Sequence, residues 1–226
     1  TDVATTKTLL HEVIPLTGTI VSGTYGTFPN DDNIKNYSHG MFQSVYDYPY
    51  LSSSANHIFD ISVGFDESSP LSGSTDAVQE KKKINMYNQF SQVLLGYTGS
   101  ANRVRLFESD LQLDESAADV MREVVFVNLS RLLTKDQIKK GSMSLTVGTA
   151  SWADPFSDTK TLVDNEASNN GGTLNTDGGD YGILTGSDGV GGIVFYQAGV
   201  MVLTSSIWAG TTDFYSASTG IRDFDN

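Results

Sequence analysis

The stretch that most constrains the fold is residues 123–147, EVVFVNLSRLLTKDQIKKGSMSLTV, in which two apolar runs flank a polar connector. The first run, residues 124–127, is β-branched and aromatic, which favours strand over helix. In the second run apolar residues alternate with Ser and Thr, so Met143, Leu145 and Val147 would share one face of a strand. We expect both strands to lie in one apolar core.

The connector between these strands carries TKDQ at residues 134–137, followed by Gly141. A Thr with a Gln three residues later is the pattern of a capping box, and glycine is frequent just beyond a helix end. The spacing therefore predicts a short helical connector over about residues 134–140.

A second capping pattern opens a long amphipathic helix, predicted over about residues 76–95. Asp76 is followed three residues later by Gln79, and Gly96 stands just past the last apolar residue. Apolar side chains recur at helical spacing on one stripe. This stripe would face the sheet and leave the lysine run 81–83 mostly in solvent.

The remaining pattern is one of short strands and polar turns. It predicts a strand at residues 58–65 and two adjacent buried strands within 192–207, broken around Ala198-Gly199. The fold class that follows is α+β, mainly β, with an antiparallel sheet or sandwich core. We expect a single β-rich domain over residues 1–226, with an N-terminal arm at 1–15.

Residues 154–192 are rich in Asp, Asn, Gly, Ser and Thr, and we expect a long loop that is functional, mobile or partly folded into short hairpins. Oxygen-rich flexible loops can hold Ca²⁺. The carboxylates that raise this possibility are Asp164, Glu166, Asp177, Asp180 and Asp188. Neither the EF-hand spacing nor a repeated glycine–aspartate array is present, so we expect solvated carboxylates and assign no metal ligand.

Charge and composition argue against several classes of partner and chemistry. Lys and Arg number 14 against 27 Asp and Glu, a net charge of −13. Recognition of phosphates rests on basic patches, so we expect no nucleic-acid partner. Cysteine is absent, which excludes disulfides and thiol chemistry. The most apolar stretch, residues 193–209, is shorter than the about 20 residues of a membrane helix, so we expect no membrane span.

The sequence nominates no catalytic residue. The histidines at 11, 39 and 57 are isolated, and none belongs to a metal-binding pair. The glycine-rich residues 189–192 precede a strand, whereas a nucleotide-binding fingerprint follows a strand and opens a helix. We expect no enzymatic activity, no cofactor and no metal. A polysaccharide-degrading enzyme stays open as an alternative, because a glycosidase needs only two carboxylates.

The best candidate for binding is the tyrosine row Tyr46, Tyr48 and Tyr50. Alternate residues of an extended segment point to one face. Aromatic rings with a polar tip suit protein interfaces and stacking on sugars. The row predicts an interface, and internal packing against the long helix is an alternative of equal weight.

Three stretches resemble virion structural proteins of tailed bacteriophages, chiefly marine myophages of the T-even-like group. They are FDISVGF at 59–65, REVVFVNLSRLLTKDQIKKGSMSLTVG at 122–148 and GGIVFYQAGVMVLTSS at 191–206. The resemblance implies a baseplate, tail or neck component present in several copies. Its partners would be other virion proteins and copies of itself. The resemblance supplies no catalytic residues and implies that the chain continues past Asn226.

These observations together predict a non-enzymatic structural subunit of a phage virion. The absence of cysteine and of a signal-peptide pattern fits assembly in the cytoplasm of a bacterial host. One alternative is a carbohydrate- or receptor-binding β domain of a fibre or decoration protein. It would use the tyrosine row or residues 164–192.

Overall fold

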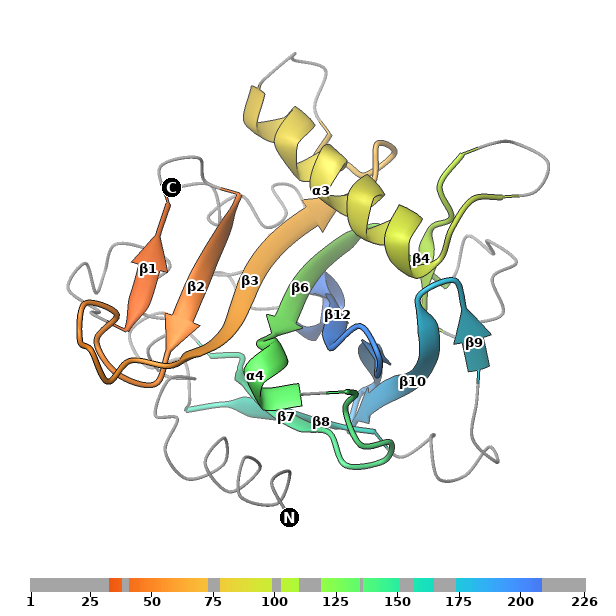
Figure 1. Ribbon diagram of the computed structural model, residues 1–226. Helices are drawn as coiled ribbons and strands as arrows, with labels where there is room; N and C mark the ends of the chain where they lie inside the picture. Colours follow the sequence, from red (N-terminus) through yellow and green to blue (C-terminus); the bar gives the residue numbers. More distant parts are fainter. Residues whose placement is uncertain are drawn as a thin grey trace.

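The structure is a computed structural model of the 226-residue chain, and it describes residues 33–37, 41–72, 78–98, 103–109, 119–134, 136–150, 157–164 and 174–208. A ten-stranded sheet organises these residues (Figure 1). Nine strands follow one path: β1 (Ile34–Asn36), β2 (Phe42–Tyr46), β3 (His57–Phe65), β6 (Glu123–Leu129), β12 (Val200–Thr204), β11 (Gly189–Phe195), β10 (Gly179–Gly186), β8 (Thr159–Val163) and β7 (Ser144–Gly148).

The other elements are short or lie on the faces of this sheet. β9 (Leu174–Thr176) pairs with β10, and β4 (Phe107–Glu108) pairs with β5 (Val120–Met121). The helices of the described residues are α3 (Val78–Leu94), α4 (Arg131–Thr134) and the 3₁₀ turn η1 (Ser205–Trp208). Every strand pairing is antiparallel. The prediction of a mainly β, α+β fold with an antiparallel sheet is confirmed.

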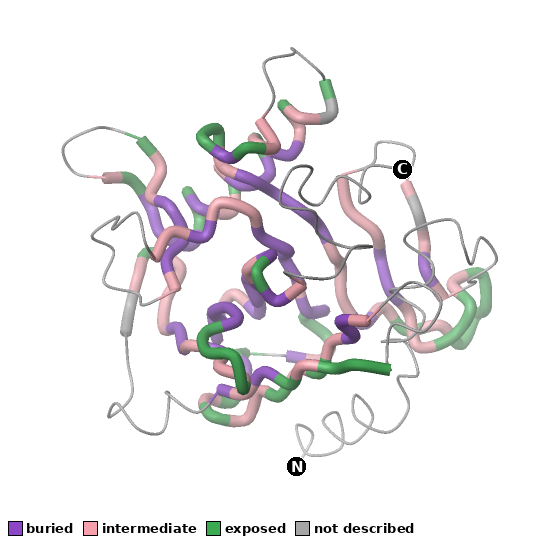
Figure 2. Tube along the Cα trace, turned by 180° about the vertical axis from the view of Figure 1, so that it is seen from behind, coloured by how far each residue is buried: buried purple, intermediate pink, exposed green. Residues whose placement is uncertain are grey.

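The central strands are buried on both faces. Val124 and Phe126 of β6 enter an apolar cluster on one face, and their neighbours Val125 and Val127 enter a second cluster on the other. Adjacent residues of a strand point to opposite faces. A strand such as β6, buried on both faces, therefore needs an unbroken run of apolar residues. Figure 2 shows the buried trace running through the middle of the molecule, with exposed segments at its rim.

Helix α3 covers the first face, where it lies across β3 and β6 (Figure 1). The ring of Phe90 stacks on Phe126 with centroids 4.1 Å apart. Gly64 of β3 permits this close packing, because a Cβ there would lie 2.9 Å from the backbone nitrogen of Tyr87. The helix predicted at 76–95 is confirmed over Val78–Leu94.

The lysine run of α3, predicted to lie mostly in solvent, is exposed at one of its three residues. Lys81 is exposed, but Lys83 is only 5% exposed. Lys83 stands four residues before Tyr87 and seven before Phe90, so it belongs to the stripe that faces the sheet. The initial Asp76 lies outside the described residues.

The second face is closed by the far end of the same sheet. Leu162 of β8, Leu145 and Val147 of β7 and Ile207 of η1 pack in one cluster with Val125 of β6. These strands are not neighbours on the path of the sheet, so the sheet must curl to bring them together. In Figure 1, β7 and β8 cross below β6. The prediction that the strands flanking the connector share a core is confirmed.

The helical turn of the connector lies earlier than the predicted residues 134–140. The backbone N–H of Thr134 donates to the carbonyl of Ser130 at 3.1 Å, and its hydroxyl to the same carbonyl at 3.4 Å. Thr134 therefore ends α4 instead of capping a new helix. Further along, the N–H of Gly141 donates to the Asp164 carboxylate at 2.8 Å. This tertiary acceptor replaces the carbonyl that a helix would have supplied.

The segment 154–192 is not one long loop, and of the alternatives predicted from composition the partly folded hairpin is confirmed by β10 and β11. It contains β8, β9, β10 and the start of β11, while residues 165–173 lie outside the described residues. The described glycines of this segment lie in strands and tight turns. Gly189 has a φ of 106° where the β10–β11 hairpin turns back. A Cβ on Gly182, in the middle of β10, would lie 2.0 Å from the hydroxyl of Tyr196.

The most apolar stretch of the chain forms two antiparallel strands, β11 and β12, joined by a turn at 196–199. This confirms the prediction for residues 192–207. In the part of the chain that the structure describes, no helix has the length and apolar character needed to cross a bilayer. The predicted arm at 1–15 and the residues after 208 lie outside the described residues.

Candidate interaction surface

A polar row crosses four neighbouring strands of the sheet: Lys35, Ser44, Asp60 and Asn128 are directly paired from β1 to β6. Directly paired residues of an antiparallel sheet point to the same face. Asp60 stands two residues from Ser62, which pairs with Phe126. The row therefore lies on the face that α3 covers farther along.

Asp60 is the centre of this row. Its Oδ1 accepts a hydrogen bond from the Ser44 hydroxyl at 2.5 Å and lies 2.9 Å from Nε2 of His57. The Ser44 hydroxyl also lies 3.2 Å from the hydroxyl of Tyr37. A catalytic triad places the imidazole between the hydroxyl and the carboxylate, whereas here the carboxylate lies between the other two groups. The arrangement suits binding through hydrogen bonds better than nucleophilic attack.

The three predicted tyrosines are not presented as an extended row. β2 ends at Tyr46, and the following residues bend. The ring of Tyr46 lies 6.3 Å from that of Tyr50 and 5.5 Å from that of His57, while Tyr48 is 52% exposed. Burial, and then the neighbouring Tyr37, raises the pKa of Tyr46. The structure thus groups Tyr46 and Tyr50 with His57 and leaves Tyr48 outside the group.

The loop between β2 and β3 is closed at its neck and open at its tip. The Asp47 carboxylate accepts from the backbone N–H of Asn56 at 2.6 Å and from its side-chain amide at 2.8 Å. Asp47 donates its own N–H to the Asn56 carbonyl at 3.1 Å. Leu51, at the tip, is 86% exposed. The loop therefore exposes the apolar side chain of Leu51 to solvent, while hydrogen bonds hold the two ends of the loop together.

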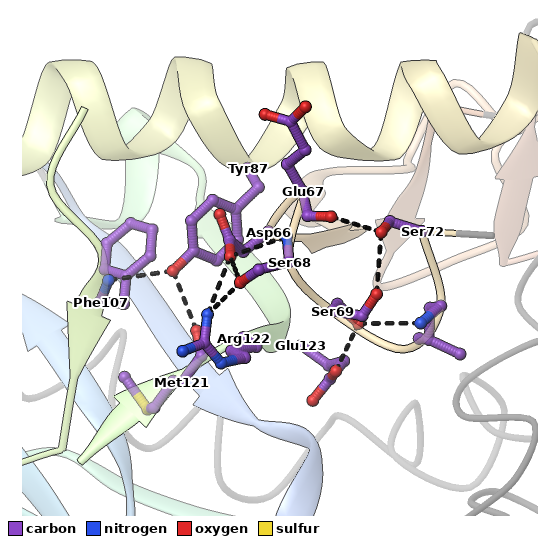
Figure 3. A network of polar contacts seen from close by, with 11 residues as sticks. Asp66, Glu67, Ser68, Ser69, Ser72, Tyr87, Phe107, Met121, Arg122 and Glu123 are labelled. Carbon is purple, nitrogen blue, oxygen red and sulfur yellow. Dashed lines mark hydrogen bonds and ion pairs between the residues drawn. The ribbon is translucent and has the colours of Figure 1, made fainter. Parts of the chain in front are cut away.

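A second polar network fastens α3 to the rest of the molecule (Figure 3). The buried Tyr87 hydroxyl donates to the carbonyl of Met121 at 2.9 Å and accepts the N–H of Phe107 at 3.0 Å. Arg122 forms an ion pair with Asp66 at 3.0 Å. The contacts join the helix, the β4–β5 pair and the end of β3, so we assign this network to folding.

Three of the described acidic residues of 154–192 are bonded to protein groups, while Glu166 lies outside the described residues. Asp164 is 2% exposed and accepts hydrogen bonds from the Tyr196 hydroxyl at 2.8 and 3.0 Å. Asp180 pairs with Lys140 at 2.5 Å and Asp188 with Lys160 at 2.9 Å. Among the described residues no group of three or more His, Asp or Glu could hold a metal. Asp164 is thus a buried structural group and not the solvated carboxylate predicted.

Strand β7 ends the described path of the sheet and offers a backbone edge, which the sequence pattern did not single out. Ser144 and Thr146 are exposed, while Leu145 and Val147 are half-buried. No charged residue occurs from Gly141 to Ala153, in a chain of net charge −13. That uncharged run, next to an alternating strand, is the signal that could have marked an edge.

Comparison with known proteins identifies no relative. No protein-family model, no curated protein and no solved structure matches this chain. The resemblance of three stretches to phage structural proteins therefore stays a prediction from the sequence. Function is argued from the geometry described above.

Proposed function

We propose that this chain is a non-enzymatic structural subunit of a tailed-phage virion, a tail, baseplate or neck component that acts by protein–protein assembly. The observation that carries the proposal is a sheet packed on both faces by its own chain, whose described path ends in an uncharged edge strand. The resemblance of the stretches at 59–65, 122–148 and 191–206 supports the phage context.

In this architecture the surface available to partner proteins lies mainly at the rim of the sheet. Both faces of the central strands are filled, so contacts with other subunits would fall on strand edges and loops. The tip of the loop between β2 and β3 offers Tyr48 and Leu51. The acidic remainder keeps free subunits soluble before assembly, because like charges oppose non-specific association. Backbone and apolar contacts at the rim, with acidic surface elsewhere, would then direct assembly in the bacterial cytoplasm.

The test is the composition of particles. Virions of the phage that encodes this chain would be purified by density gradient, and the chain would be quantified by mass spectrometry against a protein of known copy number. We expect many copies per particle. A chain found only free in the lysate, and never in particles, would contradict the proposal.

Carbohydrate or receptor binding is the second candidate, favoured by the grouping of Tyr46, Tyr50 and His57 beside Asp60. Aromatic rings next to hydrogen-bonding groups suit the apolar and polar faces of a sugar. A glycan array with the wild type and Tyr46→Ala would test it. Tyr97→Ala, which changes a tyrosine that is 48% exposed elsewhere, is the control. Sugar binding lost only in Tyr46→Ala would favour this candidate over a purely structural role.

A further inference from the structure

We propose that two copies of this chain pair through the outer edges of their β7 strands. The pairing is antiparallel about a two-fold axis and joins two sheets into one. The inference rests on the proposed function, because it names the partner of the edge that an assembly subunit would use.

The hydrogen bonds between β7 and β8 show which backbone groups of β7 point to its outer edge. The N–H of Asp164 donates to the carbonyl of Met143 at 3.0 Å, and the N–H of Thr149 donates to the carbonyl of Asp158 at 2.9 Å. The odd-numbered residues of this segment therefore bond toward β8. Bonding direction alternates along an antiparallel strand, so Ser144, Thr146 and Gly148 turn their N–H and C=O groups away from β8. The carbonyl of the buried Gly148 already accepts a hydrogen bond from Nε1 of Trp208 at 3.1 Å, so the exposed residues of this edge are Ser144 and Thr146.

The side chains agree with this assignment. Thr146 and Thr161 face each other across β7 and β8, and their hydroxyls lie 2.9 Å apart. Side chains approach most closely in the pairs that lack direct backbone bonds. The backbone groups of Thr146 are thus free of β8 and point to the outer edge.

Among the described residues, the part of this edge at Ser144 and Thr146 lacks the devices that keep strand edges from pairing, whereas Trp208 covers its end at Gly148. Natural edges are blocked by charged residues, prolines, bulges or very short strands. β7 has five residues, SLTVG, with no charge and no proline. The opposite end of the sheet differs, since β1 has three residues with Lys35 at its centre. The structure therefore favours association at β7.

A second copy fits this edge better than an arbitrary strand because β7 is complementary to itself. Antiparallel pairing about Thr146 places Thr146 opposite its symmetry mate. The hydrogen bonds centre on this pair, because the carbonyl of Gly148 in each copy is already bonded to Trp208. Leu145 then lies across from Val147 of the second copy, on the face where both residues already join an apolar cluster. Such isologous contact closes as a dimer and leaves no further β7 edge.

Charge makes the pairing dependent on salt. Each copy carries a net charge of −13. The repulsion between two copies falls as salt shortens the screening length. The contact itself brings no ionised side chain of β7 into the interface. Dimerisation should therefore strengthen as ionic strength rises.

Sedimentation velocity of the full chain over a range of concentrations, at low and high salt, tests the proposal. Thr146→Pro removes the outward N–H and leaves the bonds between β7 and β8. Thr146→Val is the matched control, because it also lacks the hydroxyl but keeps the N–H. We expect the wild type and Thr146→Val to dimerise, and Thr146→Pro to raise the dimer Kd about tenfold or more, since two symmetry-related hydrogen bonds are lost.

A second variant guards against misfolding of Thr146→Pro. Thr146→Lys keeps the N–H but places like charges opposite each other across the two-fold axis. We expect it to weaken the dimer at low salt and to recover at high salt. A wild type that stays monomeric, or a dimer with equal Kd in all four proteins, would overturn the proposal.

Hydrogen exchange adds a readout at the edge. We expect the amides of Ser144 and Thr146, which are exposed, to exchange fast in the monomer and slowly in the dimer. Protection already present in the monomer would show that the chain covers its own edge, and would overturn the pairing. A monomeric protein that still occurs in many copies in virions would refute β7 pairing alone and leave the proposed function standing.

Discussion

Gly182 holds one of the tightest contacts of the fold. A Cβ there would lie 2.0 Å from the hydroxyl of Tyr196 and 2.7 Å from a carboxylate oxygen of Asp164. The missing side chain lets a strand pass directly beneath a buried hydrogen bond. Glycine at this position of the strand is therefore required by packing. Its presence in the sequence does not indicate a loop here.

Gly182→Ala should lower the free energy of unfolding by about 1–3 kcal/mol, because the added methyl must displace the Tyr196 hydroxyl from Asp164. Urea unfolding followed by circular dichroism would measure the loss. Thr185→Ala, in the same strand, is the control. Equal stability of wild type and Gly182→Ala would contradict the packing described here.

Two buried tyrosines predict how stability depends on pH. Burial raises the pKa of Tyr87, and burial followed by the hydrogen bond to Asp164 raises that of Tyr196. In the unfolded chain these phenols ionise near pH 10, at about their ordinary pKa. The folded protein then holds more protons than the unfolded chain, so stability is full below about pH 10 and falls as pH rises.

Urea unfolding at pH 8 and pH 11 would measure this fall. The slope should reach about 1.4 kcal/mol per pH unit for each buried tyrosine. Tyr87→Phe and Tyr196→Phe should each flatten it, whereas Tyr48→Phe, at an exposed position, should not. A wild type with the same stability at both pH values would show that these phenols are not held protonated.

At the scale of elements, α3 is the part whose attachment can be tested with one side chain. Phe126 stacks on Phe90 of the helix and meets Phe107 edge-on at 5.7 Å. Phe126→Ala removes both contacts and should cost about 3–5 kcal/mol of stability. Chemical denaturation would measure it, with Val93→Ala on the exposed side of α3 as the control. A cost no greater than that of the control would refute this account of how α3 is held.

Several elements could be predicted from the sequence alone. β6 and β7 follow from period-two alternation and β-branched residues, and α3 follows from its apolar stripe. α4 was predicted too late in the chain, because the N–H and hydroxyl of Thr134 bond back to the carbonyl of Ser130 and so end a turn. A capping box opens a helix at its Thr, and here that Thr closes one. At the other end of the predicted helix, the N–H of Gly141 finds its acceptor on Asp164, in a segment remote in sequence.

The candidate surface was only partly predictable for a similar reason. Alternation pointed to Tyr46, Tyr48 and Tyr50, but the bend after Tyr46 depends on Asp47 bonding Asn56 across the loop neck. The link between Asp60, Ser44 and His57 depends on strand register. Register is a property of pairs of strands, and one strand's sequence does not state its partner.

At the scale of the whole molecule, β6 joins segments that are distant along the chain. It pairs with β3 on one side and β12 on the other. Neither neighbour is adjacent to it in sequence, so the order of the sheet could not be read from pattern alone. Sheets built from such distant pairings fold slowly, because loops must close before the contacts form.

The closed neck of the loop between β2 and β3 makes the conformation of the loop base independent of the residues at the loop tip. Asp47 and Asn56 hold the ends of the loop whatever lies between them. Substitutions at the tip, around Leu51, therefore cost the sheet little, in keeping with the tolerance of surface loops to change. The tip of this loop can thus change its side chains while the body of the protein stays the same.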